Sequence, residues 1–219
     1  MIQFYLSKDA AADLKHLVEA PSPENYQAMQ WYVHRVTIAR RKCIIAMEKQ
    51  SRYAITFCGL TKKEFADFPQ LFSYWFSLHG LASVVEQYGQ DDVLEQRVLE
   101  LAQVIADGQT YQQGVDRSVM AHINQVVDLL RYLVETRRYP LPVEPREAAI
   151  FATQANEQMR KKAQSEDYFF PALEFRGFWM GLLNLKIPAQ ASFNAAKNNE
   201  PNYTDNVIRV DFGKKQHKK

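Results

Sequence analysis

The sequence predicts an α+β protein, in which a small antiparallel sheet is covered on one face by helices and followed by a helical C-terminal extension. Two patterns support this fold class. Between residues 31 and 57, three runs rich in β-branched and aromatic residues alternate with short polar breaks. Between residues 65 and 134, apolar residues recur at spacings of three and four, as on one face of a helix. A hydrophobic content of 47% supplies a full core and excludes a largely disordered chain.

The predicted sheet consists of an N-terminal strand and a three-strand meander. The runs that predict these strands are Ile2–Leu6, Trp31–Ile38, Cys43–Met47 and Tyr53–Phe57. Because the breaks inside the meander are short, its neighbouring strands should be antiparallel. Residues Ala10–Val18 predict a short helix between the first strand and the meander.

Five helix boundaries can be assigned after the meander. A capping box at Thr61 begins one helix, Pro69 should split or kink it, and Gly80 should end it. Two further amphipathic helices begin near Asp92 and Asp116, and both should pack on the sheet.

A proline-rich motif at Tyr139–Pro142 is the best internal boundary. We therefore predict an α+β domain at 1–138, a helical and aromatic extension packed on it at 139–189, and a linker with a basic tail at 190–219. The aromatic segment Tyr168–Leu185 either completes a core with the appended helices, which we favour, or forms an exposed surface for a partner.

Composition also limits the location and the chemistry. The start of the chain lacks the pattern of a signal peptide, and no apolar run approaches roughly 20 residues, so we expect a cytoplasmic protein without a membrane partner. Cys43 and Cys58 form no Cys-x-x-Cys motif, so we expect buried thiols and no metal site. Glycines are scattered and match no nucleotide-binding fingerprint. We expect no cofactor.

Two stretches carry recognisable motifs: Trp31–His34 followed by Arg40–Ile45, and Asp116–Val119 followed by Asn124. They resemble an uncharacterised family of small bacterial domains with the pattern Trp-x-Ala-Asn, Arg-Lys-Cys, Asn-Arg-Ser and Met-Asn-Asp. The resemblance covers roughly residues 1–137 and implies the same order of meander and helices, but no known activity. The chain departs from the family pattern at three positions, His34, Ala39 and Gln125.

The first candidate site lies at the helix start after Asp116. It contains four polar side chains, Arg117, Ser118, His122 and Asn124. Ser118 and His122 are four residues apart and therefore share a helix face, near amide groups that favour an anion. This pattern predicts either an enzyme site for a phosphorylated or anionic substrate or, more simply, a capped and solvated helix start.

The second candidate site is basic. Its residues are Arg35, Arg40, Arg41 and Lys42 in the meander, and Lys214, Lys215, Lys218 and Lys219 in the tail. The net charge is +2, and four positive charges lie in the last six residues, so the rest of the chain is net negative. Basic residues beside aromatic ones can bind nucleic acid or an acidic protein surface, although they also commonly just face water.

A nucleophilic pair of Cys43 and His34 is rejected, because His34 should lie opposite a residue near 46 and a cysteine in an apolar strand has a raised pKa. The leading hypothesis is therefore a non-catalytic binding or accessory protein, associated with nucleic acid. The alternatives are an enzyme at Arg117–Asn124 and an oligomerisation module at Tyr168–Leu185.

Overall fold

The computed structural model describes residues 1–185 except 22, 24, 26 and 162–166. Residues Met1–Lys186 form one compact unit. The predicted linker and lysine tail lie outside the described residues. None of the helices in the described part of the chain is both long and apolar enough to cross a membrane.

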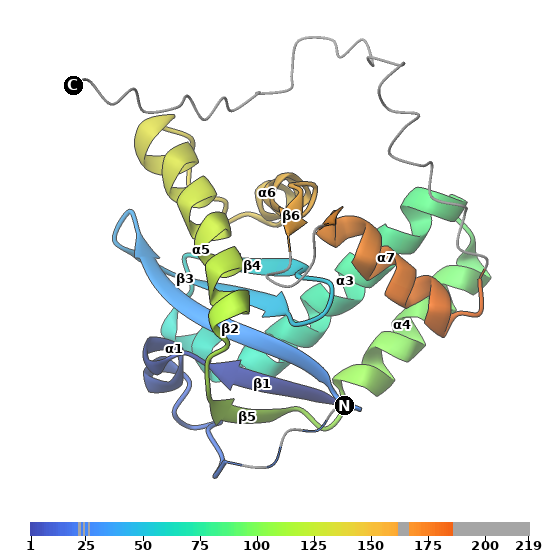
Figure 1. Cartoon of the computed structure of the whole chain (residues 1–219), viewed down its shortest axis with the longest axis horizontal. Helices are drawn as coiled ribbons and strands as arrows, with labels where there is room; N and C mark the ends of the chain where they lie inside the picture. Colours follow the sequence, from blue (N-terminus) through green and yellow to red (C-terminus); the bar gives the residue numbers. More distant parts are fainter. Residues whose placement is uncertain (22, 24, 26, 162–166, 186–219) are drawn as a thin grey trace. The chain divides into compact units, whose positions relative to one another are not determined.

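The main sheet has the strand order β4-β3-β2-β1-β5 (Figure 1). Its strands are β1 (Ile2–Leu6), β2 (Met29–Ile38), β3 (Arg41–Glu48), β4 (Ala54–Cys58) and β5 (Thr110–Gln113). A two-stranded sheet is formed by β6 (Arg160–Lys161) and β7 (Tyr168–Phe169). The α+β class is confirmed, and β2, β3 and β4 form the predicted antiparallel meander.

The N-terminal strand pairs differently from the prediction. Strand β1 runs parallel to both β2 and β5, so the sheet is mixed rather than antiparallel. A parallel neighbour requires the chain to cross back to its starting edge. The segment containing helix α1 (Lys8–Asp13) makes that return between β1 and β2.

Helices cover both faces of the sheet, so the predicted single covered face is wrong (Figure 1). One face packs against α2 (Lys62–Ala66), α3 (Phe68–Tyr88), α4 (Asp92–Ala106) and α7 (Pro171–Leu182). The other packs against α5 (Arg117–Arg131) and α6 (Pro145–Asn156). The meander strands are apolar on both sides: Ile44 belongs to the first core and its neighbour Ile45 to the second. Successive side chains of a strand point to opposite faces, so both faces need a cover.

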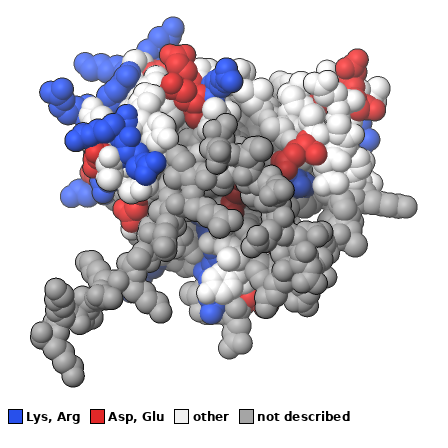
Figure 2. All heavy atoms as spheres, turned by 90° about the horizontal axis from the view of Figure 1, so that it is seen from above, with Lys and Arg blue, Asp and Glu red and all other residues white. Residues whose placement is uncertain are grey.

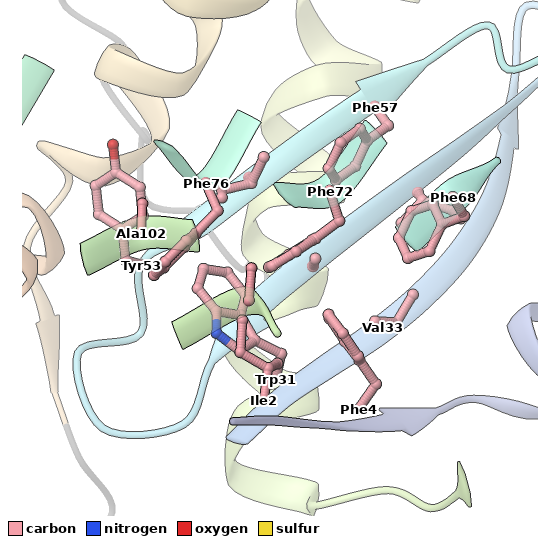
Figure 3. Packing of buried hydrophobic residues seen from close by; sticks show 14 of the residues in the cluster. Ile2, Phe4, Trp31, Val33, Tyr53, Phe57, Phe68, Phe72, Phe76 and Ala102 are labelled. Carbon is pink, nitrogen blue, oxygen red and sulfur yellow. The ribbon is translucent and has the colours of Figure 1, made fainter. Parts of the chain in front are cut away.

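The first core is built around aromatic rings, as Figure 3 shows. Phe4 of β1 and Trp31 of β2 contact Phe72 of α3 edge to face, with ring centroids 4.7 and 5.0 Å apart. Phe175 and Trp179 of α7 are fully buried in the same core. The aromatic segment of the predicted extension therefore contributes Phe175 and Trp179 to the first core.

Two of the three boundaries predicted around α3 are correct. The capping box at Thr61 is present, and Pro69 stands at the start of α3, which separates it from α2. Gly80 does not end the helix, because α3 continues through it to Tyr88 and Gly89 is its C-terminal cap. The absence of a side chain at Gly80 instead lets Trp179 approach: a Cβ atom there would lie 2.4 Å from Trp179 Cζ2.

Replacing Gly80 with alanine should therefore lower the free energy of unfolding by roughly 1–2 kcal/mol, since overpacking outweighs the gain in helix propensity. The matched control is Gly177→Ala on α7, where an added Cβ has no atom within 4 Å. That variant should be more stable by up to about 1 kcal/mol. Urea denaturation of the two variants measures both changes. Equal gains in both would show that Trp179 moves aside freely.

The exposed edge of the sheet at β4 is closed by a side chain. Asn156, at the end of α6, accepts a hydrogen bond from the Ala54 amide (2.7 Å) and donates one to the Ala54 carbonyl (2.8 Å). Its amide nitrogen also donates to the Ala152 carbonyl (2.9 Å), and the side chain is 1% exposed. Helix α6 is thereby joined to the edge strand.

Candidate functional site

Helix α5 begins with the N-cap that the sequence predicts. Asp116 Oδ1 accepts hydrogen bonds from the amides of Ser118 (2.8 Å) and Val119 (3.0 Å). Those amide groups are therefore already used, and the helix start does not offer them to an anion.

The four polar residues predicted at this helix start separate into two pairs. Arg117 and Asn124 are exposed. Ser118 is half-buried and His122 is buried, and both lie on the inner face of α5. His122 Nε2 lies 3.1 Å from the carbonyl oxygen of Lys161 in β6. The structure thus keeps Ser118 and His122 together and leaves Arg117 and Asn124 apart from them.

Two arginines that the sequence analysis did not select complete this inner face. Arg52, in the turn between β3 and β4, donates from Nη1 to the Lys49 carbonyl (2.5 Å) and from Nη2 to Ser118 Oγ (3.0 Å). Arg160 of β6 donates from Nη2 to the Ala155 carbonyl (3.0 Å). The two side chains are 7% and 3% exposed. We call Arg52, Ser118, His122 and Arg160 the arginine cluster.

Burial dominates the electrostatics of the arginine cluster. It lowers the pKa of Arg52, while the negative charges of Asp116 and Glu48 act in the opposite direction. Burial and the positive charge of Arg52 lower the pKa of Arg160 to about 10, so Arg160 stays charged at neutral pH. Among the residues that the structure describes, neither guanidinium has a carboxylate within ion-pair distance, and the Nε atom of each is buried without an acceptor.

The nearby carboxylate of Glu48 accepts hydrogen bonds from the turn that carries Arg52. It accepts hydrogen bonds from the amide of Ser51 (2.6 Å), the hydroxyl of Ser51 (2.7 Å) and the amide of Gln50 (2.9 Å). This network holds the turn in place, so Arg52 is supported by a rigid loop.

Two of the four basic residues at the turn between β2 and β3 share one carboxylate. Asp13 of α1 forms ion pairs with Arg35 (2.9 Å) and Lys42 (2.6 Å). Arg41 donates to the Gly59 carbonyl (3.4 Å). Arg40 is exposed in the turn itself, where its φ is 62°.

The surface charge in the described part of the chain is mixed where Lys and Arg gather. Figure 2 shows these side chains at the upper left of one face, with Asp and Glu side chains among them. The four tail lysines, Lys214, Lys215, Lys218 and Lys219, lie outside the described residues. Within those residues, no group of three or more His, Cys, Asp or Glu side chains could hold a metal ion.

Residues 3–174 match the model of a family described as Domain of unknown function (DUF6933). The chain belongs to this family. No curated protein and no solved structure matches the chain. The resemblance to an uncharacterised family is thus confirmed, but the DUF6933 match extends beyond residue 137 and includes α6 and β6. All four residues of the arginine cluster lie inside the DUF6933 domain.

Proposed function

We propose that this DUF6933 protein is a non-catalytic binding or accessory protein, and that its arginine cluster holds a phosphate or carboxylate group. One observation supports the proposal: Arg52 and Arg160 are two neighbouring buried cations, and the described residues place no carboxylate against either. An uncompensated buried charge costs several kcal/mol, and a bound anion removes much of that cost.

The chemistry of the cluster suits an oxyanion. A guanidinium presents donors in a planar fork that matches the oxygen atoms of phosphate and carboxylate. Ser118 adds a hydroxyl beside Arg52, and His122 fixes β6, which carries Arg160, through the Lys161 carbonyl. The residues thus come from three separate segments that the fold brings to one face of α5.

The proposal is tested by titrating the full-length protein with inorganic phosphate at constant ionic strength and following thermal unfolding. At about 100 times its Kd, phosphate should raise Tm by about 5–10 °C. Arg160→Met should abolish the rise. The matched control is Arg117→Met, since Arg117 is exposed at the same helix start, and its phosphate response should equal that of the wild type.

Two outcomes would contradict anion binding. One is an equal effect of phosphate and chloride on the wild-type Tm. The other is a phosphate response that survives in both Arg160→Met and Arg52→Met. Either result would assign the two arginines to holding the Lys49 and Ala155 carbonyls, a structural role.

Nucleic acid is a second candidate ligand, supported by the exposed position of Arg40 at the tip of the β2–β3 turn. A fluorescent single-stranded oligonucleotide titrated across a salt series distinguishes the two surfaces. Binding that weakens with salt and falls with Arg40→Ala, but not with Arg160→Met, supports nucleic-acid binding at the turn. Salt-insensitive or absent binding excludes this candidate.

A further inference from the structure

The two cysteines of the chain lie side by side on adjacent strands of the sheet. Cys43 of β3 and Cys58 of β4 are register partners in the antiparallel pair. Both thiols are free and buried, as the sequence predicts, and Cys58 keeps 8% of its surface exposed at the end of the edge strand. The rejected pair of Cys43 and His34 is indeed separated, because His34 lies opposite Ile45.

The position of this cysteine pair in the hydrogen-bond pattern of β3 and β4 makes it compatible with a disulfide. The amide of Glu48 donates to the carbonyl of Tyr53 (2.9 Å), which makes those two residues a hydrogen-bonded pair. Hydrogen-bonded and non-hydrogen-bonded pairs alternate along antiparallel strands. Cys43 and Cys58, five positions further along the ladder, therefore form a non-hydrogen-bonded pair, with Cα atoms about 4.5 Å apart. That separation lies within the range of natural disulfides.

The surroundings of Cys43 favour its thiolate. A hydrogen bond from the Cys58 thiol lowers the pKa of Cys43 most, and the Gly59 amide and the Arg41 charge add to this effect against the opposing effect of burial. The hydrogen bond to Cys43 and burial raise the pKa of Cys58. The raised pKa expected for Cys43 from its apolar strand is thus wrong, because its neighbours outweigh its burial.

We propose that Cys43 and Cys58 are a redox-active dithiol, which a hydroperoxide converts into a disulfide between β3 and β4. The Cys43 thiolate attacks one peroxide oxygen, and the O–O bond breaks to give a sulfenic acid and hydroxide, which takes up a proton. The Cys58 sulfur then attacks the Cys43 sulfur, and the S–O bond breaks. The leaving hydroxide departs as water with the Cys58 proton. Two thiols and one hydrogen peroxide thus give one disulfide and two waters, and two electrons pass to the peroxide.

The position of the pair limits which oxidants can react. Cys43 is fully buried, whereas Cys58 on the edge strand keeps 8% of its surface exposed. We therefore expect a small hydroperoxide to react with the pair much faster than a bulky disulfide does. The resulting cross-link closes the β3–β4 hairpin at the end opposite the turn that carries Arg52. This inference does not depend on the proposed anion binding.

The experiment exposes the folded full-length protein to hydrogen peroxide and follows both thiols by alkylation under denaturing conditions and mass spectrometry. The two thiols should disappear together, with a mass loss of two hydrogen atoms, and both should return on reduction. Oxidation should also raise Tm by several degrees, since the disulfide restricts the unfolded chain.

Single-cysteine variants separate the role of Cys43, which attacks the peroxide, from the role of Cys58, which attacks the Cys43 sulfur. In Cys58→Ala, dimedone should trap a sulfenic acid on Cys43, and no intramolecular disulfide should form. In Cys43→Ala, Cys58 should react at least tenfold more slowly. The proposal is overturned if the wild-type thiols react independently, if either reaches sulfinic acid while the other stays reduced, or if neither reacts before the protein unfolds.

Discussion

Replacing Asn156 with alanine is expected to lower the free energy of unfolding by roughly 2–5 kcal/mol. Along antiparallel strands, a residue in a non-hydrogen-bonded pair points its amide and carbonyl away from its partner strand. Ala54, opposite Met47, is such a residue, so its backbone groups face the edge of the sheet, where Asn156 binds both. Alanine leaves these two buried groups without a partner.

The matched control for Asn156→Ala is Thr153→Ala on the same helix. Thr153 is exposed, and its hydroxyl donates only to the Ala149 carbonyl within α6. Its replacement should change stability by no more than about 0.5 kcal/mol. Urea denaturation of both variants measures the difference. A loss in Asn156→Ala no larger than that in Thr153→Ala would mean that water replaces the side chain at the edge of β4.

Acidification from pH 7 to below pH 4 is expected to remove roughly 3 kcal/mol of stability through one histidine. Burial lowers the pKa of His79 from 6.5 to about 4. The unfolded chain therefore binds a proton at a higher pH than the folded protein does. The stability contribution of the neutral ring is complete above pH 6.5, declines as the pH falls between 6.5 and about 4, and is lost below that range.

The geometry agrees with a neutral His79. Its Nδ1 lies 2.8 Å from the hydroxyl of Tyr53, whose pKa is raised by burial, so Tyr53 donates and the ring nitrogen accepts. The ring also packs against Trp75, with centroids 5.9 Å apart. These surroundings suit a neutral ring that accepts one hydrogen bond, and they give little stabilisation to a protonated ring.

A comparison of wild type with His79→Gln isolates this effect from other titrating groups. The glutamine side chain can still accept from Tyr53 but carries no charge. Chemical denaturation at several pH values between 4 and 7 should give a steeper decline for the wild type than for the variant. Parallel curves would show that His79 is protonated in the folded protein as readily as in the unfolded chain.

The parts of the fold that the sequence predicts are those set by local pattern. The meander, the Thr61 capping box and the Asp116 cap each depend on residues close together in sequence. Strand β5 was missed because its residues, Thr110–Gln113, show no apolar alternation. It is a strand because β1 offers it a parallel edge, and that pairing depends on residues more than a hundred positions apart.

The residues of the candidate site also divide into those that local sequence predicts and those that it does not. Ser118 and His122 could be grouped in advance, since they are four residues apart on one helix. Arg52 stands in a polar turn and Arg160 in a basic run, and both settings usually mean exposure to water. Only the packing of β6 and the β3–β4 turn against α5 buries them together, and no local signal marks that contact.

The position of β1 between β2 and β5 has a consequence during synthesis of the chain. Strand β1 leaves the ribosome before both of its neighbours in the sheet, β2 on one side and β5 on the other. One edge of β1 therefore stays open until Gln113 has emerged, with α2, α3 and α4 made in the meantime. Because open strand edges are templates for wrong pairing, the nascent chain is most prone to aggregation in this interval, and its folding should be slow for its size.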